Sequence, residues 1–249
     1  MKAILIAAGE GSRMGALTKN LPKPLVDVNG SSIIERQLAL LRKNSILDIV
    51  IITGPYSEKF DFANVNYVND KNFKEHDQLG SLMCAKDNLD DDVIILFADI
   101  IFEESILEQI LESKHDVTIA VDMNWKELYR NRKNNSFSDA DKVIIENGEA
   151  TRIFKKMKEN DKNFTIGEFI GLMKLSQNGA KQFKEEYEKL EFSHSGTFHD
   201  AETLQTAKLI DILQDLIEKQ IKVNTISITG KWCEIDTTED LSVAKRLFS

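Results

Sequence analysis

A loop of small residues near the N-terminus, from Ala7 to Arg13, has the composition of a phosphate-binding site. Gly9 and Gly11 lack a Cβ atom, so their backbone N–H groups can approach a polyphosphate closely. The two alanines that open the loop leave room for a flat base or a ribose. The guanidinium of Arg13 presents a planar set of N–H donors that matches phosphate oxygens. The loop therefore predicts binding of a phosphorylated ligand.

A single lysine, Lys23, follows ten residues after Arg13 and stands between Pro22 and Pro24. Proline fixes its own φ and restricts the residue before it, so we expect extended or turn geometry and an aimed ammonium group at this position. The glycine spacing does not fit the dinucleotide fingerprint, because Met14 stands where the third glycine should fall. It does not fit the P-loop either, since that motif requires a lysine directly after its last glycine and none stands directly after Gly11 or Gly15.

Two acidic residues end strand-like segments elsewhere in the chain. Asp99 directly follows the apolar run 93–98, where a carboxylate is costly unless it is paired or bound to metal. Asp236 ends the segment Trp-Cys-Glu-Ile-Asp and precedes Thr237. It is either a second metal ligand or a capping residue of the helix that follows.

Bulk properties limit the classes of protein that the chain can represent. Its 249 residues are 42% hydrophobic and contain no linker-like stretch, so we expect one domain spanning residues 1–249. The net charge of −9 argues against nucleic-acid binding. Cys84 and Cys233 have no zinc-site spacing and are expected to be reduced thiols, and the four histidines form no motif. No segment has the length of a membrane span or signal peptide, so we expect a cytoplasmic protein.

Short β-branched runs alternate with amphipathic helical patterns, which predicts an α/β protein with a Rossmann-like open, mostly parallel mixed sheet covered by helices. The expected strands are 3–7, 49–53, 93–97, 117–121, 142–146, 151–155, 171–175 and 223–228. The expected helices are 32–43, 104–112, 177–189, 201–220 and 238–247. The polar run from Arg130 to Asp141 is the one expected long loop. Ligands of such sheets collect at the carboxyl ends of the strands, where the glycine loop begins.

The glycine loop resembles the signature L-A-A-G-x-G-[ST]-R-[ML] of nucleotidyltransferases in the nucleoside-diphosphate-sugar pyrophosphorylase superfamily, with Ile6 at its first position. The residues around Lys23 resemble the superfamily's P-K-[PC]-[LM]. The resemblance implies the nucleotide-diphospho-sugar transferase fold and a loop wrapped around a nucleoside triphosphate. The nucleotide-binding residues that it implies in this loop and at the lysine are Ala7, Ala8, Gly9, Gly11, Ser12, Arg13 and Lys23.

The same resemblance implies a catalytic set. Asp99 and Asp236 match the two magnesium ligands of the superfamily, which lie in segments of the form [GAS]-D and W-x-[ED]-[IV]-D-[TS]-x-x-D-[LY]. Nucleotidyl transfer needs a divalent cation and positive charge near the leaving pyrophosphate. Mg²⁺ is therefore the expected cofactor, with Arg13 and Lys23 neutralising the triphosphate.

Three further segments resemble the small cytidylyltransferases that act on phosphocholine, 2-aminoethylphosphonate and similar head groups. They are residues 80–85, 121–129 and 167–176, which resemble S-L-x-x-A, V-D-x-x-W and G-E-[FYW]-x-G-[LI]. This resemblance implies CTP as donor, a small phosphorylated or phosphonylated acceptor, and a monomer or homodimer. It also implies a product used as a precursor of cell-surface polysaccharide or phospholipid.

Several side chains in these segments can be given provisional roles. Gln78 and Ser81 are candidates for hydrogen bonds to the pyrimidine edge or the ribose of the nucleotide, and Asp99 is expected among the nucleotide-binding residues as well. Asp122 and Trp125 could hold a cationic acceptor by charge and a cation–π contact, or the tryptophan could pack on the core with Tyr129 four residues away.

Three charged residues complete the expected acceptor site. Glu168 either pairs with Lys155 or contacts the acceptor, and a phosphate-binding lysine is expected at Lys155 or its neighbour Lys156. Glu234, within the late acidic motif, is expected on the acceptor side as well.

Two other functions remain open at the level of sequence. One is a sugar-1-phosphate nucleotidyltransferase that uses UTP or dTTP. The other is a non-catalytic nucleotide-binding regulator, against which the joint presence of Arg13, Lys23 and both acids argues.

Overall fold

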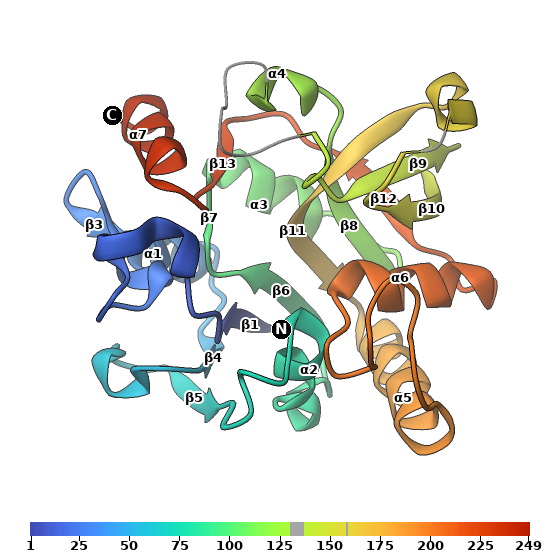
Figure 1. Ribbon diagram of the computed structural model, residues 1–249, viewed down its shortest axis with the longest axis horizontal. Helices are drawn as coiled ribbons and strands as arrows, with labels where there is room; N and C mark the ends of the chain where they lie inside the picture. The colour runs from blue at the N-terminus through green and yellow to red at the C-terminus, as the bar shows by residue number, and fades with distance from the viewer. Residues whose placement is uncertain (130–136, 158) are drawn as a thin grey trace.

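The computed structural model describes residues 1–129, 137–157 and 159–249, so residues 130–136 of the expected loop between Arg130 and Asp141 lie outside the described part. One nine-stranded sheet, in the order β5-β4-β1-β6-β11-β8-β12-β10-β9, runs through the molecule (Figure 1). The predicted α/β class with a mixed, helix-covered sheet is confirmed. Among the described residues, no helix combines the length and the apolar character needed to cross a bilayer.

The first half of the sheet is parallel. Strand β1 (Lys2–Ala7) lies between β4 (Asp48–Thr53) and β6 (Val93–Phe97), and β5 (Asn66–Asn69) pairs with the outer side of β4. Strands β1, β4 and β6 are rich in Ile, Leu and Val and mostly buried, as a parallel sheet with covered faces requires, whereas the edge strand β5 is mostly exposed. Their carboxyl ends therefore meet along one edge.

The second half of the sheet contains antiparallel pairs. The long strand β11 (Ile166–Leu175) runs antiparallel to β6, to β8 (Val117–Asp122) and to β9 (Lys142–Glu146). Strands β10 (Glu149–Phe154) and β12 (Asn224–Ser227) complete the sheet. Two short pairs lie outside it, formed by β2 (Asp27–Val28) with β3 (Ser31–Ser32) and by β7 (Ile100–Phe102) with β13 (Trp232–Glu234).

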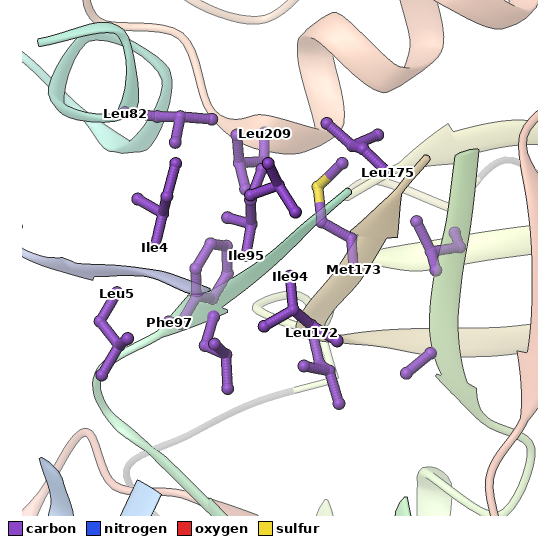
Figure 2. Packing of buried hydrophobic residues seen from close by; sticks show 14 of the residues in the cluster. Ile4, Leu5, Leu82, Ile94, Ile95, Phe97, Leu172, Met173, Leu175 and Leu209 are labelled. Atoms are coloured by element: carbon purple, nitrogen blue, oxygen red, sulfur yellow. The ribbon is translucent and has the colours of Figure 1, made fainter. Parts of the chain in front are cut away.

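Helices cover both faces of the sheet. Figure 2 shows why: Ile4 and Ile95 point toward Leu82 and Leu209, whereas Leu5 and Ile94 point to the opposite side. Helices α2, α5 and α6 lie together on the first side, and α1 and α3 on the second (Figure 1). The helices are α1 (Ile33–Lys43), α2 (Gln78–Met83), α3 (Glu104–Leu111), α4 (Lys126–Tyr129), α5 (Gln177–Ser193), α6 (Leu209–Glu218) and α7 (Thr238–Leu247).

One expected helix is wrong over its first half. Residues 201–208, expected as part of a helix to 220, form turns, and α6 begins only at Leu209. The hydroxyls of Thr203 and Thr206 bond to nearby backbone groups, which offers the chain an alternative to helix. The carbonyl of Gln205 accepts from the N–H of Asp77. The turn segment therefore supplies a carbonyl that accepts a hydrogen bond from the N-terminal end of α2.

Strand β11 reaches its several partners through a bulge. Its pairing with β8 changes register between Phe169 and Met173, and Gly171 within that interval has a φ of +79°. A Cβ at Gly171 would lie 2.2 Å from Cδ2 of Phe97. Only glycine fits this position, and the bulge bends β11 beside the end of β6.

We expect Gly171→Ala to destabilise the fold more than Gly148→Ala. Both glycines have a left-handed φ, which costs alanine about 1–2 kcal/mol, but a Cβ at Gly148 would meet nothing within 4 Å. The steric conflict with Phe97 should add about 1–3 kcal/mol to the loss of unfolding free energy in Gly171→Ala. Chemical denaturation of the two variants measures the difference, and equal stabilities would contradict the close packing at the bulge.

Candidate functional site

A cleft of about 910 Å³ opens at the carboxyl ends of β1 and β6, where the theory of open α/β sheets places ligands. Most of the side chains singled out in the sequence line it. They are Ala7, Ala8, Gly9, Gly11, Ser12, Arg13, Lys23, Gln78, Ser81, Asp99, Lys155, Glu168, Glu234 and Asp236. The structure thus brings together residues that are spread over the whole chain.

The glycine loop closes tightly against the lysine. Gly11 has a φ of +63°, and a Cβ on it would lie 2.9 Å from the Cβ of Lys23. The hydroxyl of Thr18 donates to the carbonyl of Gly11 at 2.7 Å, which fixes the turn. Residues Lys23–Leu25 form a single 3₁₀ turn after Pro22, so the predicted turn geometry around the lysine is present.

Lys23 joins the two acids that the sequence singled out. Its Nζ lies 2.6 Å from Oδ2 of Asp99 and 2.8 Å from Oδ1 of Asp236. Arg13 adds a contact of 2.8 Å from Nη2 to the same oxygen of Asp236. The four groups form a compact charged cluster at the mouth of the glycine loop.

Strand pairing places the two acids side by side. Glu234 of β13 lies opposite Ile100 of β7, and the N–H of Ile235 donates to the carbonyl of Asp99 at 2.9 Å. The cap of α7 is Thr237, which forms a capping box with Asp240. The carboxylate of Asp236 therefore does not cap α7, and it accepts hydrogen bonds from Lys23 and Arg13 instead.

The cluster shifts the pKa of its members in different directions. Burial alone would lower the pKa of Lys23, but the carboxylates of Asp99 and Asp236 outweigh it and raise the pKa well above its ordinary value. For Asp236, burial opposes ionisation, yet Lys23 and Arg13 lower its pKa. Burial and the neighbouring carboxylates of Asp236 and Asp99 raise the pKa of Glu234.

Three carboxylates are placed as a divalent cation would need them. Asp99, Glu234 and Asp236 each offer an oxygen within 4.8 Å of the others. Oδ1 of Asp99 is buried and makes no hydrogen bond to any described residue. Hard oxygen ligands and an unused buried oxygen fit Mg²⁺.

One end of the cleft carries a mixture of charges. Lys155 pairs with Asp141 at 3.1 Å, and its exposed neighbour Lys156 does not share the cleft. Glu168 accepts a hydrogen bond from the hydroxyl of Tyr129 rather than an ion pair from Lys155. The indole of Trp232 forms part of the same wall.

Asp122 and Trp125 lie behind this wall and not in the cleft. Trp125 is 1% exposed, packs edge-on against Tyr129 and donates from Nε1 to the carbonyl of Ile166 at 3.1 Å. Asp122 accepts from Nε1 of Trp232 at 2.8 Å. The geometry therefore favours the packing interpretation for Trp125. It gives Asp122 the role of orienting Trp232, whose place in the cleft the sequence does not predict.

The other end of the cleft is formed by α2 and the segment before it. Ser81 donates to Asp70 at 2.8 Å, and the side-chain oxygen of Gln78 accepts from the N–H of Leu209 at 3.2 Å. His76 also lines this end and contacts Asp70. No spacing in the sequence pointed to Asp70 or His76, because only the fold joins them to the cleft.

Comparison with known proteins gives consistent matches. Residues 3–156 match the family described as the MobA-like NTP transferase domain. CTP:phosphoglutamine cytidylyltransferase of Campylobacter jejuni is 30% identical over 98% of each chain. Choline-phosphate cytidylyltransferase of Streptococcus pneumoniae is 27% identical over 86% of this chain and 99% of its own.

Solved structures share the fold at lower identity. CTP:phosphocholine cytidylyltransferase from Streptococcus pneumoniae superposes with a TM-score of 0.76, at 22% identity over 100% of this chain and 99% of that one. A UDP-glucose pyrophosphorylase gives a TM-score of 0.74 at 15% identity, over 99% of this chain and 97% of that one.

We expect the thiol of Cys84, next to this end of the cleft, to react slowly despite its exposure. Although the residue is exposed, partial desolvation of its thiol and the carboxylate of Asp70 raise the pKa of Cys84 to about 11. At about pH 8 this raised pKa lowers the fraction of thiolate by roughly a hundredfold. A thiolate of higher pKa is more nucleophilic, and this increases its intrinsic rate by about tenfold. Alkylation should therefore be about tenfold slower than for an ordinary thiol and should accelerate up to about pH 11.

Iodoacetamide labelling followed by peptide mass spectrometry measures the rate at each residue. The denatured protein supplies the reference rate, and Asp70→Asn should accelerate labelling of Cys84 because it removes the neighbouring charge. A labelling rate that levels off near pH 8.5, the ordinary thiol value, would contradict the raised pKa.

Proposed function

As a member of the MobA-like NTP transferase family, this chain is a nucleotidyltransferase, and we propose that it transfers CMP from CTP to a small phosphorylated head group. The observation that carries the proposal is the position of the Lys23 ammonium, held between Asp99 and Asp236 at the mouth of a glycine loop. That arrangement concentrates positive charge and carboxylate ligands where a triphosphate would lie.

The proposed reaction is a direct displacement. A phosphate oxygen of the acceptor attacks the α-phosphorus of CTP, the bond to the β-phosphate breaks, and its electron pair leaves with pyrophosphate. Arg13 and Lys23 neutralise charge that develops on the leaving group, and backbone N–H groups of the glycine loop hold the phosphates in line. The reaction requires no covalent intermediate on the enzyme.

The carboxylates in and directly after β13, with the one that follows β6, suit a divalent cation. Asp99 and Asp236, with Glu234 as a third oxygen donor, would hold Mg²⁺, which would supply Lewis-acid polarisation of the transferred phosphoryl group. Binding of the triphosphate gives Lys23 an alternative partner, so the lysine can exchange a carboxylate contact for a phosphate contact without leaving the cluster.

The choice of CTP is supported by the two cytidylyltransferases that align with most or all of the chain. The choice of acceptor is supported by charge. Lys155 provides a cation for an acceptor phosphate, while Glu168, Glu234 and the face of Trp232 suit an ammonium group nearby. We therefore propose an acceptor that carries both a phosphate or phosphonate and an amino or trimethylammonium group.

A matrix of nucleoside triphosphates against phosphorylated acceptors tests this proposal. CTP with phosphocholine, 2-aminoethylphosphonate or a phosphorylated amino acid amide should release pyrophosphate faster than CTP with inositol phosphate, because inositol phosphate lacks the cationic group. UTP and dTTP with sugar 1-phosphates serve as comparison reactions. A clear preference for those pairs would reject the cytidylyltransferase proposal and assign the enzyme to the sugar nucleotides.

We expect Asp99→Asn to lower turnover by at least about a hundredfold, because it removes a charged metal ligand while keeping the shape of the side chain. Asp87→Asn is the matched control, since its side chain is 93% exposed and pairs only at the surface with Lys184. Pyrophosphate release measures turnover, titration with Mn²⁺ measures cation affinity, and circular dichroism checks the fold. Normal turnover in Asp99→Asn would exclude this residue as a ligand.

A further inference from the structure

His76 stands at the α2 end of the cleft with its ring held by a buried acid. Its Nδ1 lies 3.0 Å from Oδ1 and 3.1 Å from Oδ2 of Asp70. The side chain of Asp70 is fully buried, whereas that of His76 keeps 15% of its surface exposed and lines the cleft. Nε2 of His76 makes no hydrogen bond within the described parts of the chain, which leaves it available to a ligand.

Asp70 is itself firmly placed. It follows β5 directly, donates its N–H to the carbonyl of Thr53, and accepts from the hydroxyl of Ser81 and the N–H of Asn72. The ring of His76 also rests against the backbone of α2, since a Cβ on Gly80 would lie 2.8 Å from its Cγ. The histidine is therefore oriented from two sides.

The contact with Asp70 selects the tautomer of a neutral ring. A carboxylate only accepts hydrogen bonds, so the proton of the imidazole lies on Nδ1 and a lone pair remains on Nε2. His76 thus presents a hydrogen-bond acceptor to the cleft. The hydroxyl of Ser81 and the side-chain oxygen of Gln78, which lie nearby, already bond to Asp70 and to Leu209.

The position of the phosphates decides which part of a nucleotide meets His76. In the proposed reaction Arg13 and Lys23 hold the triphosphate beside the glycine loop, and the mixed charges around Lys155 occupy one end of the cleft. The base must then extend past the small residues Ala7 and Ala8 toward α2. That end carries the polar side chains of His76, Gln78 and Ser81, together with the charged Lys74, Asp77 and Lys208.

We propose that His76 selects cytosine, with Nε2 accepting a hydrogen bond from the 4-amino group of the base and Asp70 acting as the positioning residue. The inference rests on the proposed use of CTP. Uracil places a carbonyl oxygen where cytosine has its amino group, so two lone pairs face each other and UTP is rejected. Selection of the nucleotide is thereby assigned to a pair of side chains that no sequence motif contains.

The test measures equilibrium binding of CTP and UTP in the presence of Mg²⁺ and needs no acceptor. In the native protein CTP should bind at least about tenfold more tightly than UTP, as expected for one unpaired polar contact in a buried site. His76→Phe keeps a flat ring but removes the acceptor, so the preference should disappear mainly through weaker binding of CTP. His115→Phe makes the same change at an exposed residue outside the cleft and should leave the preference intact.

Asp70→Asn separates orientation from simple loss of structure. The asparagine oxygen, at the position of Oδ1, can still accept from the N–H of Asn72. Its amide group then donates to Nδ1 of His76 and to the hydroxyl of Ser81, which can also act as an acceptor, and the imidazole proton moves to Nε2. The cleft would then present a donor, and the preference should shift by about tenfold or more toward UTP. Equal weakening of both nucleotides, with thermal unfolding as the check on folding, would indicate a structural role only.

A CTP analogue without the 4-amino group, 2-pyrimidinone ribonucleoside triphosphate, tests the atom involved. The analogue should bind the native protein more weakly than CTP does. The His76→Phe variant should bind the analogue and CTP about equally well. An unchanged CTP preference in His76→Phe, or equal binding of CTP and UTP by the native protein, would overturn the inference. Selective CTP binding without pyrophosphate release for any acceptor would instead overturn the proposed function alone.

Discussion

The site depends on one interaction, the contact of the Lys23 ammonium with both Asp99 and Asp236. Lys23 lies in a 3₁₀ turn after the glycine loop, Asp99 follows the parallel strand β6, and Asp236 follows the short strand β13. Burial of a lysine is costly unless its charge is compensated, and these carboxylates compensate it. Every other element of the cleft is arranged around that cluster: the glycine loop on one side, the paired strands β7 and β13 beneath it.

The division of the sheet gives the two ends of the cleft different chemistry. The parallel strands β5, β4, β1 and β6 end in turns and in α2, and this end of the cleft carries His76, Gln78 and Ser81 together with the charged side chains of Lys74, Asp77 and Lys208. The antiparallel part around β11 brings Lys155 and Glu168 to the opposite end, and the separate strand β13 adds Trp232. The bulge at Gly171 bends β11 beside the end of β6, where Phe97 and Gly171 both line the cleft.

The sequence predicted the local parts of this site and missed those that depend on distant contacts. The glycine loop, Lys23 and the acid after β6 could be recognised because each is defined by neighbouring residues. Trp125 could not be told from a binding residue, since four-residue spacing fits both a binding face and core packing, and its burial follows only from the fold. The sequence pattern predicts a helix over residues 201–208, where the structure has turns. Those turns are stabilised by hydrogen bonds to the start of α2, more than 100 residues away, and a local pattern cannot show such contacts.

The order of the strands along the chain has a consequence for biosynthesis. Lys23 and Asp99 are made early, but β13 and Asp236 follow all nine strands of the large sheet. A nascent chain can form the local parallel units soon after they leave the ribosome, whereas contacts of high sequence separation form late. The complete charge cluster therefore exists only in a chain whose synthesis has passed β13, and incomplete chains present the lysine to one carboxylate instead of two.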